Sequence, residues 1–230
     1  MPASKQDKVL VACPHCGHHQ AEPRTAISTV CKKCRKHYHV REALNPTPKT
    51  VERALERKRI TCFDCGAELE VAVAAESTMC KRCSHYVDLK DYHIANAVSK
   101  NFKTKGAFII ETKGYVFNTE AIVGEAVLKG RFLGKLVAER SLTIYDSAEF
   151  KGTFKTARLI VPPANHFRWA ETIQVRSAEI AGELVADLRA EGTVLLKATA
   201  RMFGNIAAGN LVVEGGAVLV GSARVGMKPL

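Results

Sequence analysis

A five-residue motif of the form apolar-x-Gly-x-apolar recurs through the second half of the chain. Its centres are Gly134, Gly152, Gly182, Gly204 and Gly221, and the pattern places Trp169 in the same slot. The mean spacing is about 17 residues, with uneven individual steps. A short period built only of strands is typical of a β-solenoid, in which each turn of chain pairs with the turn before it.

Short apolar-x-apolar units between these centres predict the strands of such turns. They occur as LTI, LIV, IQV and LVV, starting at residues 142, 159, 173 and 211. Alternate side chains of a strand lie on one face, so each unit would bury two side chains in ladders inside the solenoid. An antiparallel sandwich also has short alternating strands, but it explains neither a fixed period nor a recurring glycine. We therefore expect a mainly β chain with a β-solenoid over residues 105–226.

All eight cysteines lie in the first part of the chain and form two copies of one pattern. Two residues between the cysteines of a pair let both sulfur atoms point at one ion, and Gly17 and Gly66 fit the tight bend that follows. A dithiol redox motif is the alternative interpretation. We expect two small zinc ribbons with one structural Zn²⁺ each, held by Cys13, Cys16, Cys31 and Cys34 in the first and by Cys62, Cys65, Cys80 and Cys83 in the second.

Polar residues flank the cysteines. With four thiolates available, the histidines are expected at the surface rather than as ligands: His15, His18, His19, His37, His39 and His85. The basic residues are candidates for contacts with a partner or with phosphate, or they offset the negative charge of a zinc–thiolate centre: Lys32, Lys33, Arg35, Lys36, Lys81 and Arg82. The net charge of +11 favours acidic partners, without choosing among nucleic acid, anionic lipid and acidic protein.

Composition shifts predict the order of the domains. We expect a first ribbon, a linker containing a short helix capped by Thr47, a second ribbon, a second linker and the solenoid, over residues 8–40, 41–57, 58–98, 99–104 and 105–226. The start of the chain does not resemble a signal peptide, and no apolar run is long enough to cross a bilayer. These features favour a cytosolic protein.

The two ends of the repeat region carry no obvious cap. The repeats start at GAFIIETKGYVF, directly after a basic linker, and only MKPL follows the last one. An uncapped solenoid exposes strand edges and apolar side chains, which predicts end-to-end self-association and, if the contacts propagate, a filament. The expected polymer contacts are Phe108, Ile109, Ile110, Leu219 and Val220, for which an ordinary place in the core is the alternative.

Residues 105–226 resemble the bactofilins, a family of polymer-forming bacterial cytoskeletal proteins. The resemblance rests on the glycine-centred repeats together with VAERSLTI, AEFKGTF and GNIAAGNLVVEGGAVLVG. It implies a right-handed β-helix that polymerises without nucleotide and acts as a scaffold in cell shape, envelope growth or the positioning of other proteins. Two zinc ribbons stand where many bactofilins have a short tail, which in some members attaches to the membrane. A cytoplasmic location, including the inner face of the membrane, follows from the resemblance, but the sequence carries no signal for membrane attachment.

These observations together predict a non-enzymatic scaffold. Its solenoid would form homopolymers, and its ribbons would recruit a protein or a nucleic acid. The alternative is a zinc-ribbon nucleic-acid-binding protein that uses the solenoid to oligomerise. An enzyme is disfavoured because His166, the only histidine of the repeat region, lies alone in an expected loop beside two prolines.

Overall fold

The structure is a computed structural model that describes residues 8–44 and 56–226. The chain divides into two compact units, Met1–Val87 and Asp88–Leu230. This division lies before the linker expected at residues 99–104. The helix expected after Thr47 falls outside the described residues, and a short helix, α1 (Val40–Leu44), precedes it.

The first unit holds two copies of one small arrangement, each made of two antiparallel hairpins. Each hairpin carries one cysteine pair in its turn. The strands of the first copy are β1 (Lys8–Ala12), β2 (His19–Pro23), β3 (Ser28–Val30) and β4 (His37–His39). Those of the second copy are β5 (Arg57–Thr61), β6 (Glu68–Ala72), β7 (Ser77–Met79) and β8 (Tyr86–Asp88).

Few side chains form the core of each copy. In the first copy Val11, Tyr38 and Val40 are buried in one cluster with Cys13 and Cys31. In the second copy the buried side chains include Ile60, Leu69, Val71 and Val87. Cores of this size contribute little folding free energy, so these modules need a further source of stability such as a bound metal.

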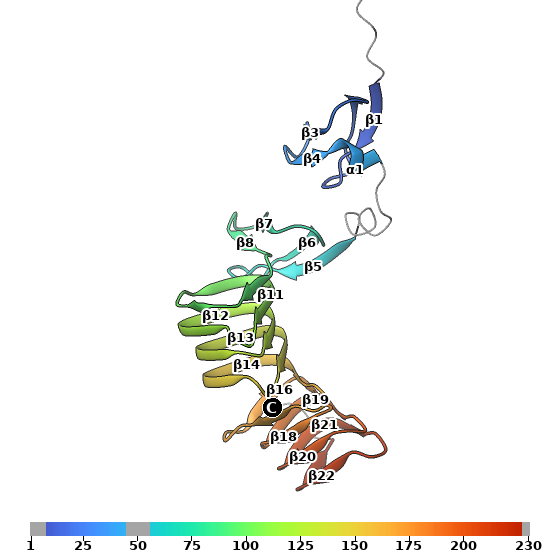
Figure 1. Cartoon of the computed structure of the whole chain (residues 1–230). Helices are drawn as coiled ribbons and strands as arrows, with labels where there is room; N and C mark the ends of the chain where they lie inside the picture. Colours follow the sequence, from blue (N-terminus) through green and yellow to red (C-terminus); the bar gives the residue numbers. More distant parts are fainter. Residues whose placement is uncertain (1–7, 45–55, 227–230) are drawn as a thin grey trace, which may run out of the picture. The chain divides into compact units, whose positions relative to one another are not determined.

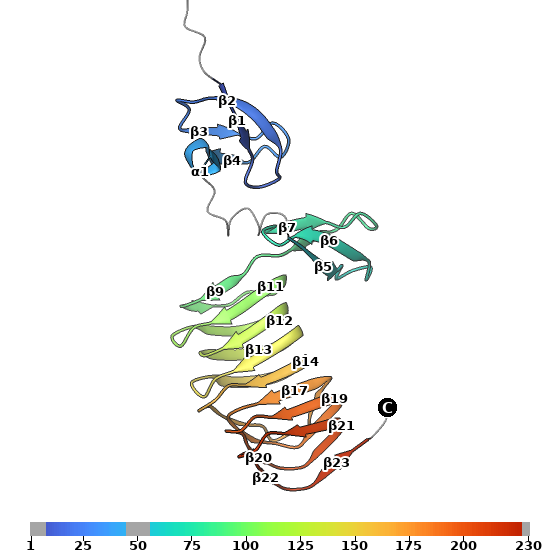
Figure 2. The same cartoon turned by 90° about the vertical axis from the view of Figure 1, so that its right-hand side faces the viewer.

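The second unit is a β-solenoid of parallel strands, which Figure 1 and Figure 2 show stacked turn upon turn. Its longer sheet runs in the order β23-β21-β19-β17-β14-β13-β12-β11-β9, and a second sheet runs β15-β18-β20-β22. The core between the strands is apolar, with Phe108, Leu136 and Leu184 among its fully buried side chains. The prediction of a mainly β chain with a β-solenoid behind two four-cysteine modules is confirmed.

The first strands of the unit are β9 (Tyr92–Ile94), β10 (Ala97–Val98), β11 (Phe102–Ile110), β12 (Tyr115–Leu128), β13 (Arg131–Ile144) and β14 (Glu149–Val161). The later ones are β15 (His166–Arg168), β16 (Ile173–Val175), β17 (Ser177–Ile180), β18 (Glu183–Val185), β19 (Leu188–Leu196), β20 (Arg201–Phe203), β21 (Ile206–Val213), β22 (Val218–Val220) and β23 (Ala223–Val225).

The solenoid begins earlier than residue 105, where the sequence places it. Strand β9 pairs with β11, and β10 pairs with β12, both in parallel register. Phe102 and Thr104, inside the segment expected as a linker, are buried in β11. The sequence pattern misses this first turn because its strands β9 and β10 are too short to show any periodicity.

The glycine column differs from the predicted one at a single position. The register places Met202 opposite Leu184 and opposite Leu219, so Gly204 lies between Ala186 and Gly221. Ala186 therefore takes the slot that the motif assigned to Gly182. Backbone hydrogen bonds from the nitrogen of Trp169 to Val185 and from that of Ala186 to Phe203 place Trp169 in the same column, as the pattern predicts.

Close backbone approach explains why glycine recurs in this column. Gly134, Gly152, Gly204 and Gly221 have φ values of 151°, 133°, 132° and 146°. A Cβ atom on Gly152 would lie 1.9 Å from the carbonyl oxygen of Gly134, and one on Gly221 would lie 2.1 Å from that of Gly204. A side chain in this geometry would force adjacent turns apart.

At the level of Trp169 the adjacent turns of the solenoid are separated in this way. Strand β14 pairs with β13 from Glu149 onward, but its register with the following strand, β17, covers only residues 158–161. The short strand β15 begins a new sheet and pairs with β18. Between the two, the rings of Trp169 and Phe154 lie 4.9 Å apart and those of Trp169 and Phe150 lie 5.6 Å apart. Aromatic packing thus replaces the strand ladder at this level of the solenoid.

Candidate metal centres and assembly surface

The eight cysteines come together in the two groups that their spacing predicts. Within each group the four sulfur atoms lie within 4.8 Å of one another. The Sγ–Sγ distances are 3.7 Å for Cys13–Cys34 and 3.5 Å for Cys16–Cys31, and both corresponding pairs of the second group are 3.6 Å apart. A tetrahedron with Zn–S bonds of about 2.3 Å has edges of about 3.8 Å, so both groups fit one zinc ion each.

The same backbone turn presents each cysteine pair. The amide of the residue after the second cysteine donates to the carbonyl of the first, as Gly17 does to Cys13 at 2.9 Å and Ser84 does to Cys80 at 2.8 Å. That residue has a left-handed backbone in all four turns, with φ of 69°, 58°, 67° and 59° at Gly17, Arg35, Gly66 and Ser84. The sequence pattern identifies the two glycines. It does not identify Arg35 and Ser84, which adopt the same backbone conformation although they carry side chains.

Backbone amides also favour the thiolate form at Cys31 in the first group and at Cys62 and Cys80 in the second. The amide of Cys34 donates to the sulfur of Cys31 at 3.5 Å, and this hydrogen bond is the main cause that lowers the Cys31 pKa to about 6. A hydrogen bond from the amide of Cys83 is the main cause that lowers the Cys80 pKa to about 6. Because a metal binds the thiolate, these hydrogen bonds favour a cation at both groups, against the burial that raises the pKa of Cys13. All four donors are protein sulfur atoms, which suits a structural ion.

The flanking histidines do not join either group. Among the described residues, the clusters that could hold a metal consist of cysteines alone. His15 Nε2 lies 3.3 Å from the carbonyl oxygen of His37, and His85 lies 3.6 Å from the carboxylate of Asp64. All six basic candidates on the cysteine turns are exposed: Lys32, Lys33, Arg35, Lys36, Lys81 and Arg82.

The C-terminal end of the solenoid exposes apolar side chains. Val218 and Val220 on β22 are 45% and 53% exposed, Val225 on β23 is 54% exposed, and Leu219 is half-buried between its neighbours. Strands β22 and β23 are edge strands, with no described strand beyond them. Leu219 and Val220, expected as polymer contacts, therefore lie at an open end.

The N-terminal end of the solenoid is different. Phe108 and Ile110 are fully buried and Ile109 is half-buried, because β9 pairs with this part of β11. The sequence analysis places these three residues at the N-terminal end of the solenoid, but in the structure they lie one strand further in. At the edge itself, Lys100 lies over the rings of Tyr92 and Phe102, at 5.4 and 4.9 Å from their centroids.

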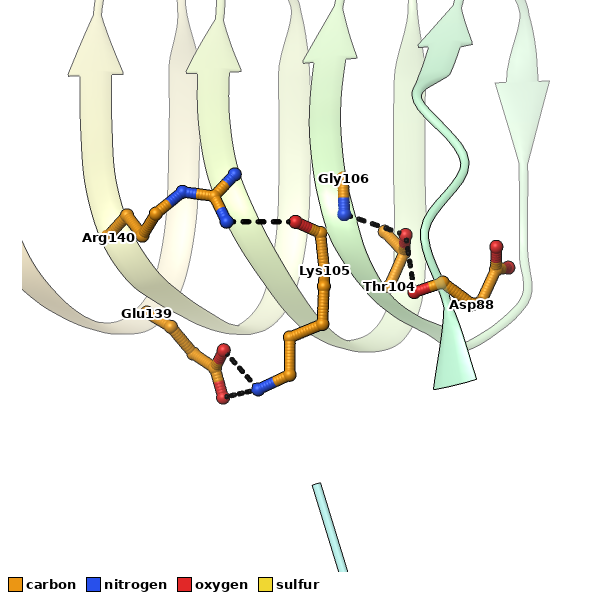
Figure 3. Close-up of polar contacts among 6 residues, drawn as sticks. All are labelled: Asp88, Thr104, Lys105, Gly106, Glu139 and Arg140. Carbon is orange, nitrogen blue, oxygen red and sulfur yellow. Dashed lines mark hydrogen bonds and ion pairs between the residues drawn. The ribbon is translucent and has the colours of Figure 1, made fainter. Parts of the chain in front are cut away.

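An ion pair between a buried lysine and a glutamate at the surface joins the first turns, as Figure 3 shows. Lys105 is only 3% exposed, and its Nζ lies 2.8 and 2.5 Å from the two carboxylate oxygens of Glu139. Arg140 donates to the carbonyl oxygen of Lys105 at 3.0 Å, and the amide of Gly106 donates to Thr104 Oγ1 at 3.0 Å. The pair links residues 34 positions apart, so no local sequence pattern could have revealed it.

His166 is exposed, and its Nδ1 lies 3.5 Å from a carboxylate oxygen of Glu183. It belongs to the strand β15, not to the loop expected from the sequence. An exposed imidazole beside one carboxylate is an ordinary surface contact.

Comparison with known proteins supplies one match. The family model of the bactofilins, described as polymer-forming cytoskeletal, matches residues 167–224. No curated protein and no solved structure matches the chain. Among the described residues, no helix is long and apolar enough to span a membrane. The matched segment runs from β15 into β23, so this part of the β-solenoid is similar to the bactofilins, and the chain before the solenoid carries two four-cysteine groups that fit zinc-ribbon-like modules.

Proposed function

We propose that the protein is a non-enzymatic cytoskeletal scaffold whose solenoid assembles end to end into filaments without nucleotide. The match to a polymer-forming family supports this function. The observation that carries it is the open C-terminal end, where Val218, Val220 and Val225 are about half exposed on edge strands. Edge strands that expose both apolar side chains and free backbone groups favour pairing with another chain.

A filament requires two contact surfaces on every subunit. In the described solenoid these are β22 and β23 at one end and β9 and β10 at the other, since they are the outermost strands. Leu219 and Val220 contact the neighbouring subunit in this proposal. Phe108, Ile109 and Ile110 lie on β11, which pairs with β9. They therefore support the contact at the opposite end without lying on its outermost strand.

Charge substitutions at the C-terminal end test this assembly. In the double variant Val218→Asp/Val220→Asp, we expect loss of pelletable polymer with an unchanged circular dichroism spectrum, because exposed carboxylates would repel one another across the contact. Leu133→Asp is the matched control, since Leu133 is 37% exposed on a central strand away from both ends. Polymer that persists in the double variant, or that is lost equally in the control, would exclude this contact.

We further propose that each ribbon holds one structural Zn²⁺ and that the ribbons recruit a partner to the filament. The six exposed basic side chains on the cysteine turns support an acidic partner, either a protein or a nucleic acid. Binding of DNA or RNA that weakens steeply with salt, and that requires residues 1–87, would identify the partner as a nucleic acid. Absence of such binding would leave an acidic protein as the partner class. The scaffold acts in the cytoplasm in this account.

A further inference from the structure

The break in the solenoid leaves strand edges on both of its sides, on β14 and on β15, without a ladder partner among the described residues. Residues 149–154 of β14 pair with β13 on one side, while the register with β17 starts only at Arg158. On the next level, β15 pairs with β18 and with no other described strand. Each strand residue carries one amide and one carbonyl, so part of the backbone of β14 presents unpaired groups at this edge.

A pocket with an aromatic wall lies beside the open edge. It has a volume of about 340 Å³ and is lined by Phe154 and Trp169 together with residues 153, 155 and 171–174. Phe154 and Trp169 are both half-buried and pack against the core of the solenoid. A pocket of this size accepts one or two large apolar side chains.

The charges around the pocket favour an acidic ligand. Lys155, Arg168 and Arg176 are exposed, and none of the three side chains has a hydrogen-bond or ion-pair partner among the described residues. Lys155 lines the pocket, Arg168 precedes Trp169, and the backbone of Arg176 is hydrogen-bonded to Ala157 of β14. The one unpaired acidic side chain at the pocket is Glu171, so the unpaired charges sum to a positive patch.

We propose that this edge and pocket form a docking site for an extended, acidic polypeptide segment of a partner protein. The segment adds to residues 149–154 of β14 as a strand, inserts one aromatic or large aliphatic side chain against Phe154 and Trp169, and places acidic side chains near Lys155 and Arg168. Strand addition supplies backbone hydrogen bonds, and the pocket supplies selectivity. The site is independent of the solenoid ends, and it starts outside residues 167–224, which match the family.

A designed peptide tests the proposal on the full chain. The probe is a fluorescein-labelled peptide of about seven residues, in which glutamate and valine alternate around a central phenylalanine. We expect saturable binding by fluorescence anisotropy and slowed amide exchange within residues 149–154. The same peptide with lysine in place of glutamate, and the same peptide with N-methylated backbone amides, should both bind at least about tenfold more weakly.

Variants locate the binding on the chain. The double variant Lys155→Glu/Arg168→Glu should weaken binding of the glutamate peptide by about tenfold or more, because it replaces attraction by repulsion at two positions. Arg189→Glu is the matched control, since Arg189 is exposed on β19, a strand that is paired on both sides at this residue. Trp169→Ala should weaken the phenylalanine peptide more than a peptide with alanine at its centre.

Four results would overturn the proposal. They are absence of binding by the glutamate peptide at millimolar concentration, equal loss in the Arg189→Glu control, exchange protection only at the C-terminal edge strands, and binding of single-stranded DNA at this site in place of the peptide. Protection of residues 149–154 on polymerisation without peptide would also overturn it, because the occupant would then be a second copy of this chain.

Discussion

At the scale of single residues, backbone geometry decides which positions of the repeat must be glycine. The sequence motif identifies Gly134, Gly152, Gly204 and Gly221 correctly, and the structure gives the reason in their positive φ values and their contacts with the preceding turn. It misplaces Gly182, because a glycine flanked by apolar residues looks the same whether it lies in the column or in a neighbouring turn. Only the register between turns separates the two cases.

Replacing one glycine of the column tests this explanation. Gly152→Ala should lower the free energy of unfolding by about 3 kcal/mol, because its Cβ atom would lie 1.9 Å from the carbonyl oxygen of Gly134 at a backbone angle that alanine disfavours. Gly215→Ala should change it by less than about 0.5 kcal/mol, since nothing lies within 4 Å of that Cβ position. Urea unfolding followed by circular dichroism measures both values. Equal stability of the two variants would refute the steric account.

The pair of Lys105 and Glu139 marks a limit of sequence reasoning at this scale. Lysine is rarely buried without a partner, and the burial of Lys105 could be known only once the turns were stacked. The pair of Lys135 and Glu120 consists of the same two residue types but lies in solvent, where such a pair contributes little. The two pairs differ in burial, which the local sequence does not encode.

At the scale of elements, the ribbons follow from the sequence almost completely. Cysteine spacing determines both the hairpin turns and the four-sulfur groups, because two pairs on facing turns can meet at one ion. The first turn of the solenoid does not follow from the sequence. Strands β9 and β10 are three and two residues long, and such short segments carry no periodic signal.

Removing the metal should unfold the two ribbons and leave the solenoid folded. We expect two zinc ions per folded chain by elemental analysis and one ion in Cys80→Ser, which breaks a single group. Chelation should then release the amide protection of residues 8–44 and 56–87 and leave that of the solenoid, whose core is built from its own stacked strands. Folded, zinc-free protein, or loss of the solenoid on chelation, would contradict this division.

At the scale of the whole molecule, we propose different tasks for different parts of the chain. The solenoid ends would serve assembly, the aromatic break at Trp169 would serve as a docking edge, and the basic cysteine turns would provide a second contact for an acidic partner. The sequence predicts the first and third tasks, since apolar termini and basic residues are visible in it. The second depends on the loss of strand pairing beside one tryptophan, and this loss is a consequence of how the turns stack.

The central claim is that the solenoid polymerises by itself. Electron microscopy of the purified chain without nucleotide, beside a chain that lacks residues 1–87, tests this most directly because the solenoid forms a separate compact unit. The account predicts filaments from both proteins, since the edge strands at the two ends are present in both. Strictly monomeric particles from both proteins would contradict it.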